Sequence, residues 1–212
     1  MNEKVYTNIK KRILNLHYAP GHNLNLKQLA KEFGVSQTPI REALMRLEWE
    51  KLVVILPRMG IHVAKIDFQE LKEVYLSRVL IEGELGRLAA KNITEDHLLN
   101  MKNLHATCKR LKGDKTKENL VELDYQFRNV IFDAASCSTL QEIAELLYNQ
   151  TLRVWYLTFD ETDISSEVKM EAQEIEDTIN AFSKHDFSIA KDLRREIIMR
   201  WIERLHKYYT RL

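Results

Sequence analysis

The sequence predicts a mainly α-helical protein, with an N-terminal winged helix-turn-helix followed by an all-α helical bundle. Three observations support this fold class. Two short helical patterns meet at Gly34-Val35-Ser36, a small apolar hairpin follows them up to Ala64, and the chain from Asp67 onward keeps helical spacing and contains no proline. We therefore expect two domains, at residues 1–66 and 67–212.

An apolar stripe predicts the first helix of the N-terminal domain. Four apolar side chains recur three or four residues apart, which places them on one face of a helix. Pro20-Gly21 ends the segment, because proline and glycine both interrupt helices. The stripe consists of Val5, Ile9, Ile13 and Leu16.

Two short helices joined by a tight turn come next. Asn25 has a glutamine three residues after it, which is the capping-box pattern of a helix start. Gly34 can end this helix in the left-handed conformation, and Ser36 or Thr38 can cap the helix that follows. The spacing therefore predicts a helix-turn-helix.

The second of these helices is predicted to expose a polar N-terminal end. Its apolar positions from Ile40 to Leu47 follow helical spacing and form one buried stripe. In a helix-turn-helix such an end lies in the major groove of DNA, where arginine suits guanine and glutamine suits adenine. A plain helical hairpin with a solvated face has the same pattern. The residues off the stripe are Gln37, Thr38, Arg41 and Met45.

Two further features favour DNA binding over the plain hairpin. The β-prone runs at residues 52–56 and 61–64 flank Pro57-Arg58-Met59-Gly60, a basic, glycine-containing tip that is typical of a wing. Residues 1–66 contain 11 Lys and Arg against 5 Asp and Glu, whereas residues 67–212 contain 21 against 26. The net charge of +1 therefore combines +6 in one domain with −5 in the other, as neutralisation of DNA phosphates by one domain requires.

On these residues the N-terminal domain resembles the GntR family of bacterial transcription regulators. The resemblance rests on Pro20-Gly21, Leu29-Ala30, residues 35–44 and Gly60. Gln37 stands where many members carry arginine, and glutamine suits adenine where arginine suits guanine, so both bases stay open at this contact. The resemblance implies DNA contacts from Lys27, Ser36, Gln37, Thr38 and Arg41, and from the wing tip at Arg58 to Gly60.

Composition restricts the class of protein further. No apolar run approaches the roughly 20 residues of a membrane span, and the N-terminus leads into an amphipathic helix rather than a signal core. Cys108 and Cys137 lie far apart, which favours free thiols over a disulfide or a zinc site. We expect a soluble, cytoplasmic protein that is not an enzyme, because no nucleophile stands beside a suitable base and no glycine loop could cradle a phosphate.

Six helices are expected in the second domain. Most of them begin at a residue whose side chain can cap a helix. The fourth helix has Gln141 as its expected capping partner, and a polar stretch at residues 160–166 separates it from the fifth. The first helix is expected to begin at Asp67, the second to run from Thr94 to near Gly113, and the third from about Thr116 to Ala135. The fourth is expected to begin at Ser138, the fifth to end near His185, and the sixth to run from Asp186 to the C-terminus.

This domain resembles the effector-binding FCD domain of the FadR-like branch, in its shorter six-helix, VanR-like variant. The resemblance rests on Arg78 with Glu82, on residues 124–128, and on Asp186 with Ala190. It implies a bundle that holds a small organic acid in its core. In the family this acid often lies beside a divalent metal ion bound by one aspartate and three histidines.

The metal ligands of the family are only partly present. Asp124 is kept, but Arg128 stands at the first histidine position, and an arginine has no free lone pair for a metal. The other two positions fall on Ile175 and Ile197. We therefore expect no metal and no cofactor. A register shifted by one residue is the alternative, and it places Glu174 and Glu196 at these positions.

Arg78, Asp124 and Arg128 are the candidate effector-binding residues. The two guanidinium groups could clamp a carboxylate or a phosphate, because guanidinium binds such anions in a bidentate manner. Ordinary ion pairs across one helical turn are the alternative, between Arg78 and Glu82 and between Arg128 and Asp124.

We expect a homodimeric, ligand-responsive regulator that binds a pseudo-palindromic operator in double-stranded DNA. Its effector is expected to be a small organic acid or another anionic metabolite. One alternative is a constitutive DNA-binding dimer whose helical domain only dimerises. A second alternative is a helical-bundle enzyme tethered to DNA, and Asp124 is the only residue that supports it. The sequence leaves open the identity of the effector and whether it releases or recruits DNA.

Overall fold

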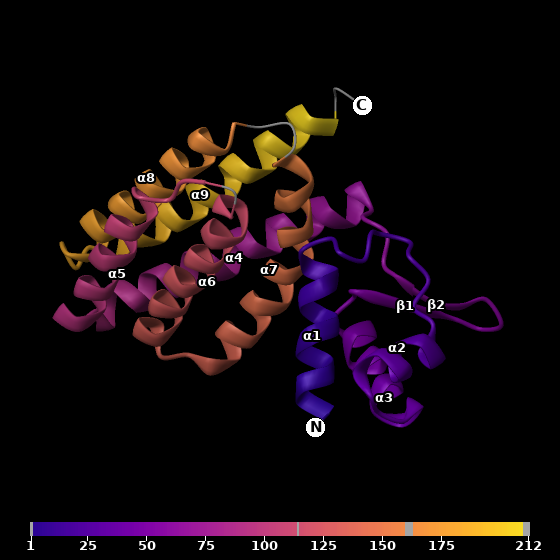
Figure 1. Cartoon of the computed structure of the whole chain (residues 1–212). Coiled ribbons are helices and arrows are strands. Elements are labelled where there is room, and N and C mark those ends of the chain that lie inside the picture. The colour runs from indigo at the N-terminus through magenta and orange to yellow at the C-terminus, as the bar shows by residue number, and fades with distance from the viewer. Residues whose placement is uncertain (1, 114, 160–162, 210–212) are drawn as a thin grey trace. The chain divides into compact units, whose positions relative to one another are not determined.

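The structure is a computed structural model that describes residues 2–113, 115–159 and 163–209. It confirms the predicted fold class, a mainly α-helical chain with a small two-stranded sheet in its N-terminal part (Figure 1). The chain divides into two compact units. Unit 1 comprises Met1–Leu71 and Tyr148–Leu157, and unit 2 comprises Lys72–Leu147 and Thr158–Leu212.

Unit 1 contains three short helices and a hairpin around an apolar core. The helices are α1 (Asn2–Leu14), α2 (Leu26–Phe33) and α3 (Gln37–Trp49), and the strands are β1 (Val53–Leu56) and β2 (Gly60–Val63). Apolar side chains of α1, of α3 and of the residue before β1 are fully buried together, because the helices present their apolar stripes to one another. The fully buried side chains are Ile9, Ile13, Ile40, Leu44, Leu47 and Leu52.

The start and end signals of the helix-turn-helix lie where the sequence predicts them. The Asn25 side chain accepts hydrogen bonds of 2.9 and 3.1 Å from the backbone N–H groups two and three residues later, and so caps α2. Gly34 ends α2 in the left-handed conformation, with φ of 65°. Ser36, rather than Thr38, is the N-cap residue of α3.

The first helix is shorter than predicted. α1 ends at Leu14, and Leu16 lies beyond it with φ of 59°. The N–H of Tyr18 reaches back to the carbonyl oxygen of Arg12 at 3.0 Å, which closes the helix before Pro20 is reached. Leu16 therefore does not continue the helical stripe.

The hairpin has a regular antiparallel register. Val53 lies opposite Val63 and Leu56 opposite Gly60, so the strands begin and end within one residue of the predicted runs. The tip turns through positive φ angles at Arg58 (64°) and Gly60 (102°). Glycine adopts such an angle without steric cost, which explains its place in the tip.

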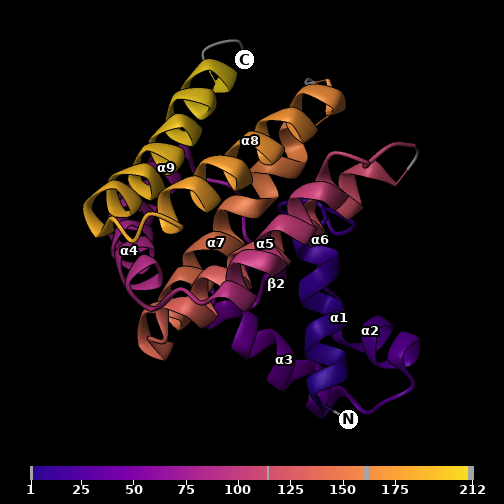
Figure 2. The same ribbon diagram turned by 90° about the vertical axis from the view of Figure 1, so that its left-hand side faces the viewer.

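Six long helices follow in the described part of the chain, in the predicted order (Figure 2). Side chains of Asp67, Thr94 and Asp186 cap the helices that they were predicted to start. α8 packs beside α9 and also against α5. The six helices are α4 (Phe68–Asn92), α5 (Glu95–Cys108), α6 (Thr116–Ala135), α7 (Ser138–Thr158), α8 (Ile164–Phe182) and α9 (Phe187–Tyr209).

Several predicted helix details are wrong. α5 ends five residues before Gly113, because its last N–H groups turn into tighter i to i+3 hydrogen bonds beyond Cys108. α8 begins inside the predicted polar separator, since Asp163 caps it by accepting from the N–H of Ser165, and it ends at Phe182. The side chain of Gln141 donates to Glu145, one turn further along α7, at 2.9 Å. Residues 160–162 of the separator lie outside the described residues.

Two glycines permit a close approach of α9 to α4. A Cβ atom on Gly83 would lie 2.5 Å from Cγ of Arg195, and one on Gly86 would lie 2.5 Å from Cγ of Arg194. Both distances are shorter than any ordinary contact, so the glycines let the stems of these arginines lie directly against α4. Within the described residues, no helix is long and apolar enough to cross a membrane.

Candidate functional site

The candidate DNA-binding residues are all exposed on unit 1. Ile40 and Leu44 turn the apolar face of α3 into the core, which leaves the first turn of the helix to solvent. α2 and the wing tip contribute the remaining exposed side chains. The exposed set is Lys27, Ser36, Gln37, Thr38, Arg41, Arg58 and Gly60.

The cations of this set differ from the paired cations of the same unit. Arg12 pairs with Glu32, and Arg46 of α3 pairs with Glu3 at 2.8 Å. Within the described residues, Lys27, Arg41 and Arg58 have no such carboxylate partner. Their charges are therefore available to an external anion, which is what phosphate contacts require. Contact with DNA at these residues stays a prediction.

The side chain of His62 links the wing tip to the segment at Gly21. Its Nε2 lies 3.1 Å from the carbonyl oxygen of Met59, and its Nδ1 lies 3.4 Å from that of Gly21. Met59 itself is 71% exposed, so the tip presents an apolar side chain beside Arg58. The wing is therefore held at its base while its tip stays accessible.

A cluster of buried charges occupies the core of unit 2. Glu82 of α4 is 2% exposed and accepts hydrogen bonds from three arginines. Arg78 of α4 donates from Nε and Nη2 to Oε1, at 2.8 and 2.6 Å. Arg128 of α6 donates to both oxygens, at 2.9 and 3.1 Å, and Arg194 of α9 donates to Oε2 at 3.0 Å. One carboxylate thus joins three helices.

The arginines decide the charge state of Glu82. Burial by itself raises the pKa of a carboxyl group, because it removes water from the charged form. The guanidinium groups of Arg128, Arg78 and Arg194 outweigh this effect and hold the pKa of Glu82 well below its usual range. Glu82 is therefore ionised at neutral pH.

Three more carboxyl groups border the cluster. Glu174 of α8 accepts from Nη1 of Arg194 at 2.9 Å, and Glu171 of α8 is 5% exposed with a side-chain oxygen that has no hydrogen-bond partner. Burial, then the negative charges of Asp124 and Glu174, raise the pKa of Glu171 well above its usual value. Burial likewise raises the pKa of Glu174, so both carboxyl groups of α8 hold a proton to higher pH than an exposed glutamate does.

The cluster is closely packed. The enclosed space beside Glu82, Arg128 and Arg194 offers about 0 Å³ to a water-sized molecule. Ile131 and Phe132 cover this space from α6. The chain's own carboxylate therefore fills the position between the guanidinium groups.

The structure places the three candidate effector residues in or beside this cluster. The ordinary pair of Arg78 with Glu82 is confirmed. Arg128 also binds Glu82, 46 residues away, and Asp124 is buried at 7% exposure near Glu171 and Glu174. Binding of an effector by these residues stays a prediction.

The residues at the family's metal positions do not fit a metal ion. Arg128 brings a cation, and Ile175 and Ile197 are buried at 0% and 2% exposure without a donor atom. The residues of the shifted register do not form a metal site either, since Glu174 already binds Arg194 and Glu196 is exposed. In the described part of the chain, no group of three His, Cys, Asp or Glu residues is arranged to hold a metal.

Arg194 is a member of the cluster that was not predicted from the sequence. Its position one turn after Ala190 and before Ile197 and Ile198 lies on the buried face of α9, and a charged residue at such a position needs a buried partner. That signal was present in the sequence. The identity of the partner could not be read from local spacing, because Glu82 lies 112 residues earlier in the chain.

Comparisons with known proteins agree with this architecture. Residues 1–63 match the bacterial regulatory proteins of the gntR family, and residues 73–200 match the FCD domain. The HTH-type transcriptional repressor RspR of Escherichia coli K12 is 29% identical over 187 residues, which is 88% of this chain and 80% of RspR. YdhC of Bacillus subtilis, an uncharacterized HTH-type transcriptional regulator, is 30% identical over 141 residues, or 66% and 63% of the two chains.

A solved structure shows the same fold. The structure of Escherichia coli McbR/YncC matches with a TM-score of 0.85 over 98% of each chain, at 23% sequence identity. The structure of a "putative transcriptional regulator GntR" from Rhodococcus sp. RHA1 matches with a TM-score of 0.74 over 97% of each chain, at 15% identity. The order of a winged helix-turn-helix and a helical bundle is therefore common to these proteins.

Proposed function

We propose that this chain, which belongs to the gntR family of bacterial regulatory proteins and carries an FCD domain, binds its operator as a homodimer under the control of a small organic anion. It is a transcriptional regulator with a DNA-binding domain. It acts in the cytoplasm, where bacterial DNA lies, and has no catalytic role.

The observation that carries the proposal is the set of exposed cations without partners at Lys27, Arg41 and Arg58. They lie on the module with a net charge of +6, next to the polar first turn of α3. In this interpretation Arg41 reads a base edge, while Lys27 and Arg58 neutralise phosphates.

Selection from a random duplex library tests the DNA-binding surface. We expect an enriched inverted repeat, because a dimeric helix-turn-helix reads two half-sites about one helical turn apart. Arg41→Ala should weaken binding by about 1–3 kcal/mol and relax one base position. Lys27→Ala and Arg58→Ala should weaken binding to all sequences and lower its salt dependence.

Arg46→Ala is the matched control, because Arg46 lies on the same helix and already pairs with Glu3. It removes the same charge from a position outside the proposed surface. Fluorescence anisotropy with the selected duplex gives the affinities. Equal losses in Arg41→Ala and Arg46→Ala would contradict the assignment of the first turn of α3.

Exposed apolar residues on α4 support the homodimer. Leu76 and Leu80 are 47% and 67% exposed and stand one turn apart, where a second copy could cover them. Analytical ultracentrifugation should give twice the chain mass of 25.0 kDa. Leu80→Lys should shift the equilibrium toward the monomer, and a dimer of unchanged stability would refute this interface.

The filled cluster around Glu82 favours a second candidate function. If the core admits no effector, the helical domain could only dimerise, and DNA binding would be constitutive. Operator affinity measured with and without a panel of organic acids separates the two. A response to any acid favours ligand control, whereas an unchanged affinity with every acid favours the constitutive protein.

Repression is the proposed direction of control. RspR and GlaR, two relatives from Escherichia coli, are named repressors. A reporter gene placed behind the selected operator should be expressed more strongly when this chain is absent. Lower expression in its absence would show an activator.

A further inference from the structure

The effector site expected in the bundle core is occupied by the protein itself. Arg78, Arg128 and Arg194 direct their guanidinium groups at Glu82, and about 0 Å³ remains beside them. An incoming carboxylate would have to displace a buried ionised residue that is held by five hydrogen bonds. An effector site with open space therefore has to be sought away from the space between these three guanidinium groups.

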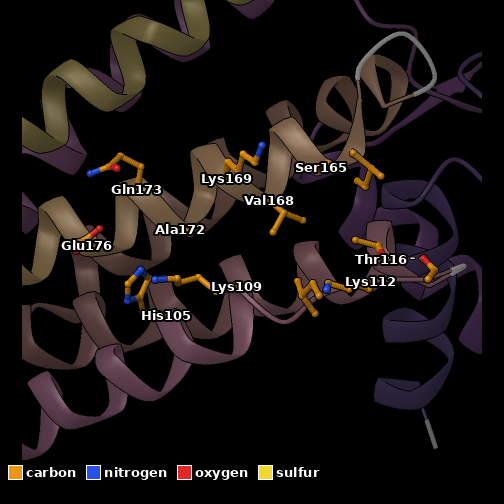
Figure 3. A pocket seen from close by; sticks show the side chains of 13 residues that line it. His105, Lys109, Lys112, Thr116, Ser165, Val168, Lys169, Ala172, Gln173 and Glu176 are labelled. Carbon is orange, nitrogen blue, oxygen red and sulfur yellow. Dashed lines mark hydrogen bonds between the residues drawn. The ribbon is translucent and has the colours of Figure 1, made fainter.

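Unit 2 contains such a space between α5 and α8. A groove with a volume of about 770 Å³ lies between the first half of α8 and the end of α5 with the segment that follows it, at residues 109–113 (Figure 3). Figure 3 shows Val168 of α8 pointing toward the segment that carries Lys112. The volume lies within the range of about 300–1,000 Å³ that is typical of small-molecule sites.

The lining of the groove combines an apolar floor with a cationic rim. Leu111, Val168 and Ala172 supply apolar surface between the two helices. Lys109 and Lys112 come from the α5 side, and the remaining cationic side chains of the lining are Lys169 and His105. An apolar body with an anionic group would match both parts of this lining.

The lysines are available for a ligand. Within the described residues, the ammonium groups of Lys109, Lys112 and Lys169 have no carboxylate partner. Glu176 is the carboxylate in the lining, and it lies at the end that carries His105 and Gln173 (Figure 3). Among the described residues of the lining, three lysines therefore face one glutamate, and this part of the rim is cationic.

The start of α6 adds to the positive potential at the opposite end of the groove. α6 begins at Thr116, which lines the groove, whereas the N-terminus of α8 is already capped by the carboxylate of Asp163. The N-terminus of a helix carries a partial positive charge, because its first N–H groups lack partners within the helix. The hydroxyl group of Thr116 donates to the carbonyl oxygen of Gly113 at 2.6 Å, which fixes the turn beside Lys112.

We propose that the groove between α5 and α8 binds a small organic anion that carries an apolar body, and that it is the effector site of this chain. The second part rests on the proposed function, because it assumes that a ligand controls DNA binding. The anionic group lies among Lys109, Lys112 and the N-terminus of α6. The apolar body lies on Val168 and Ala172.

Calorimetric titration of the full chain with octanoate tests this site. Octanoate supplies a carboxylate and an apolar chain, octan-1-ol supplies the apolar chain alone, and inorganic phosphate supplies the charge alone. We expect octanoate to bind more tightly than either. Equal affinity for octan-1-ol would refute the role of the lysines, and equal affinity for phosphate would refute the role of the apolar floor.

Variants locate the binding. The double variant Lys109→Gln with Lys112→Gln should weaken octanoate binding by about tenfold, since two charge interactions at a partly exposed site are lost. Ser165→Trp, from an exposed position on α8, should fill the groove and abolish binding. Lys102→Gln is the matched control, because Lys102 is exposed on α5 outside the groove.

The remaining outcomes overturn the proposal in different ways. Undiminished octanoate binding in the double variant and in Ser165→Trp would place the ligand elsewhere. Absence of any octanoate binding to the wild type would remove the groove as a site for this class of ligand. Neither result depends on DNA, whereas failure of the wild type to bind any selected duplex would refute the proposed function itself.

Discussion

Replacement of Glu82 by glutamine tests the central role of the buried carboxylate. Glutamine keeps the shape of the side chain but exchanges one oxygen for an NH₂ group, which is a donor facing donors. The less damaging orientation of the glutamine amide places its oxygen at the position of Oε1 and keeps the three hydrogen bonds that Oε1 accepts. It loses the two bonds that Oε2 accepts from Arg128 and Arg194, at 3.1 and 3.0 Å.

The structure sets the size of the expected loss. Each hydrogen bond to a charged group contributes about 1.5–3 kcal/mol, so two lost bonds correspond to about 3–6 kcal/mol. Removal of one partner from a buried ion pair costs about 3–5 kcal/mol, which agrees with this range. Since whole proteins are stable by only about 5–15 kcal/mol, Glu82→Gln should leave little stability.

Urea unfolding followed by circular dichroism measures the effect. With a slope of about 3 kcal/mol per molar urea, the midpoint should fall by about 1–2 M. Glu84→Gln is the control, because Glu84 lies two residues further along α4 in a pair with Arg87 that is about one-third exposed. That change should cost about 0–1 kcal/mol. Equal losses in the two variants would refute the reasoning about the buried cluster.

Three further changes test other parts of the structure. Glu171→Gln should stabilise the protein near pH 8, because burial and nearby carboxylates raise the pKa of Glu171 above its usual value of 4.5. Protonated Glu171 contributes fully to the free energy of unfolding below its usual pKa of 4.5, and this contribution is lost as the pH rises through its pKa in the folded protein. The unfolding curves of wild type and variant should therefore converge toward pH 5. Gly86→Ala should cost about 1–3 kcal/mol in thermal or urea unfolding, because its Cβ would lie 2.5 Å from Cγ of Arg194. Gln37→Arg should shift the selected base from adenine toward guanine at one position of each half-site.

Each of these changes has a control in the same element or the same module. Glu176→Gln, on the exposed side of α8, should leave the pH dependence of stability unchanged. Ser77→Ala, at a half-buried position of α4, should cost less than Gly86→Ala. Gln28→Arg adds the same charge to α2 and should change affinity without changing the selected base. A control that matched its partner variant would contradict the corresponding prediction.

Local signals in the sequence were sufficient for the helix-turn-helix. Asn25 and Gly34 act on backbone groups within a few residues of themselves, so their effect can be read without knowledge of the rest of the chain. α6 has the predicted bounds, Thr116–Ala135, for the same reason. Where the end of a helix depends on how the backbone turns, as beyond Leu14 and Cys108, the prediction was several residues too long.

The buried cluster lay beyond such signals. Spacing predicts the pair of Arg78 with Glu82, because the two residues stand one turn apart on a single helix. It cannot predict that Arg128 and Arg194 reach the same carboxylate from α6 and α9, or that Glu171 is left without a hydrogen-bond partner. The protonation states of these groups follow from burial and distance, which only the packed bundle defines.

The sequence by itself determined the fold class, the order of the helices and the residues that the DNA-binding module exposes, because caps, periodicity and charge act locally. The tertiary structure decided how the helical domain uses its charges. Packing of α9 against Gly86 brings Arg194 to Glu82, and the chain's own carboxylate then fills the place between the arginines. The groove beside Val168 likewise exists only because α5 and α8 pack side by side, and no spacing along the chain records that distance.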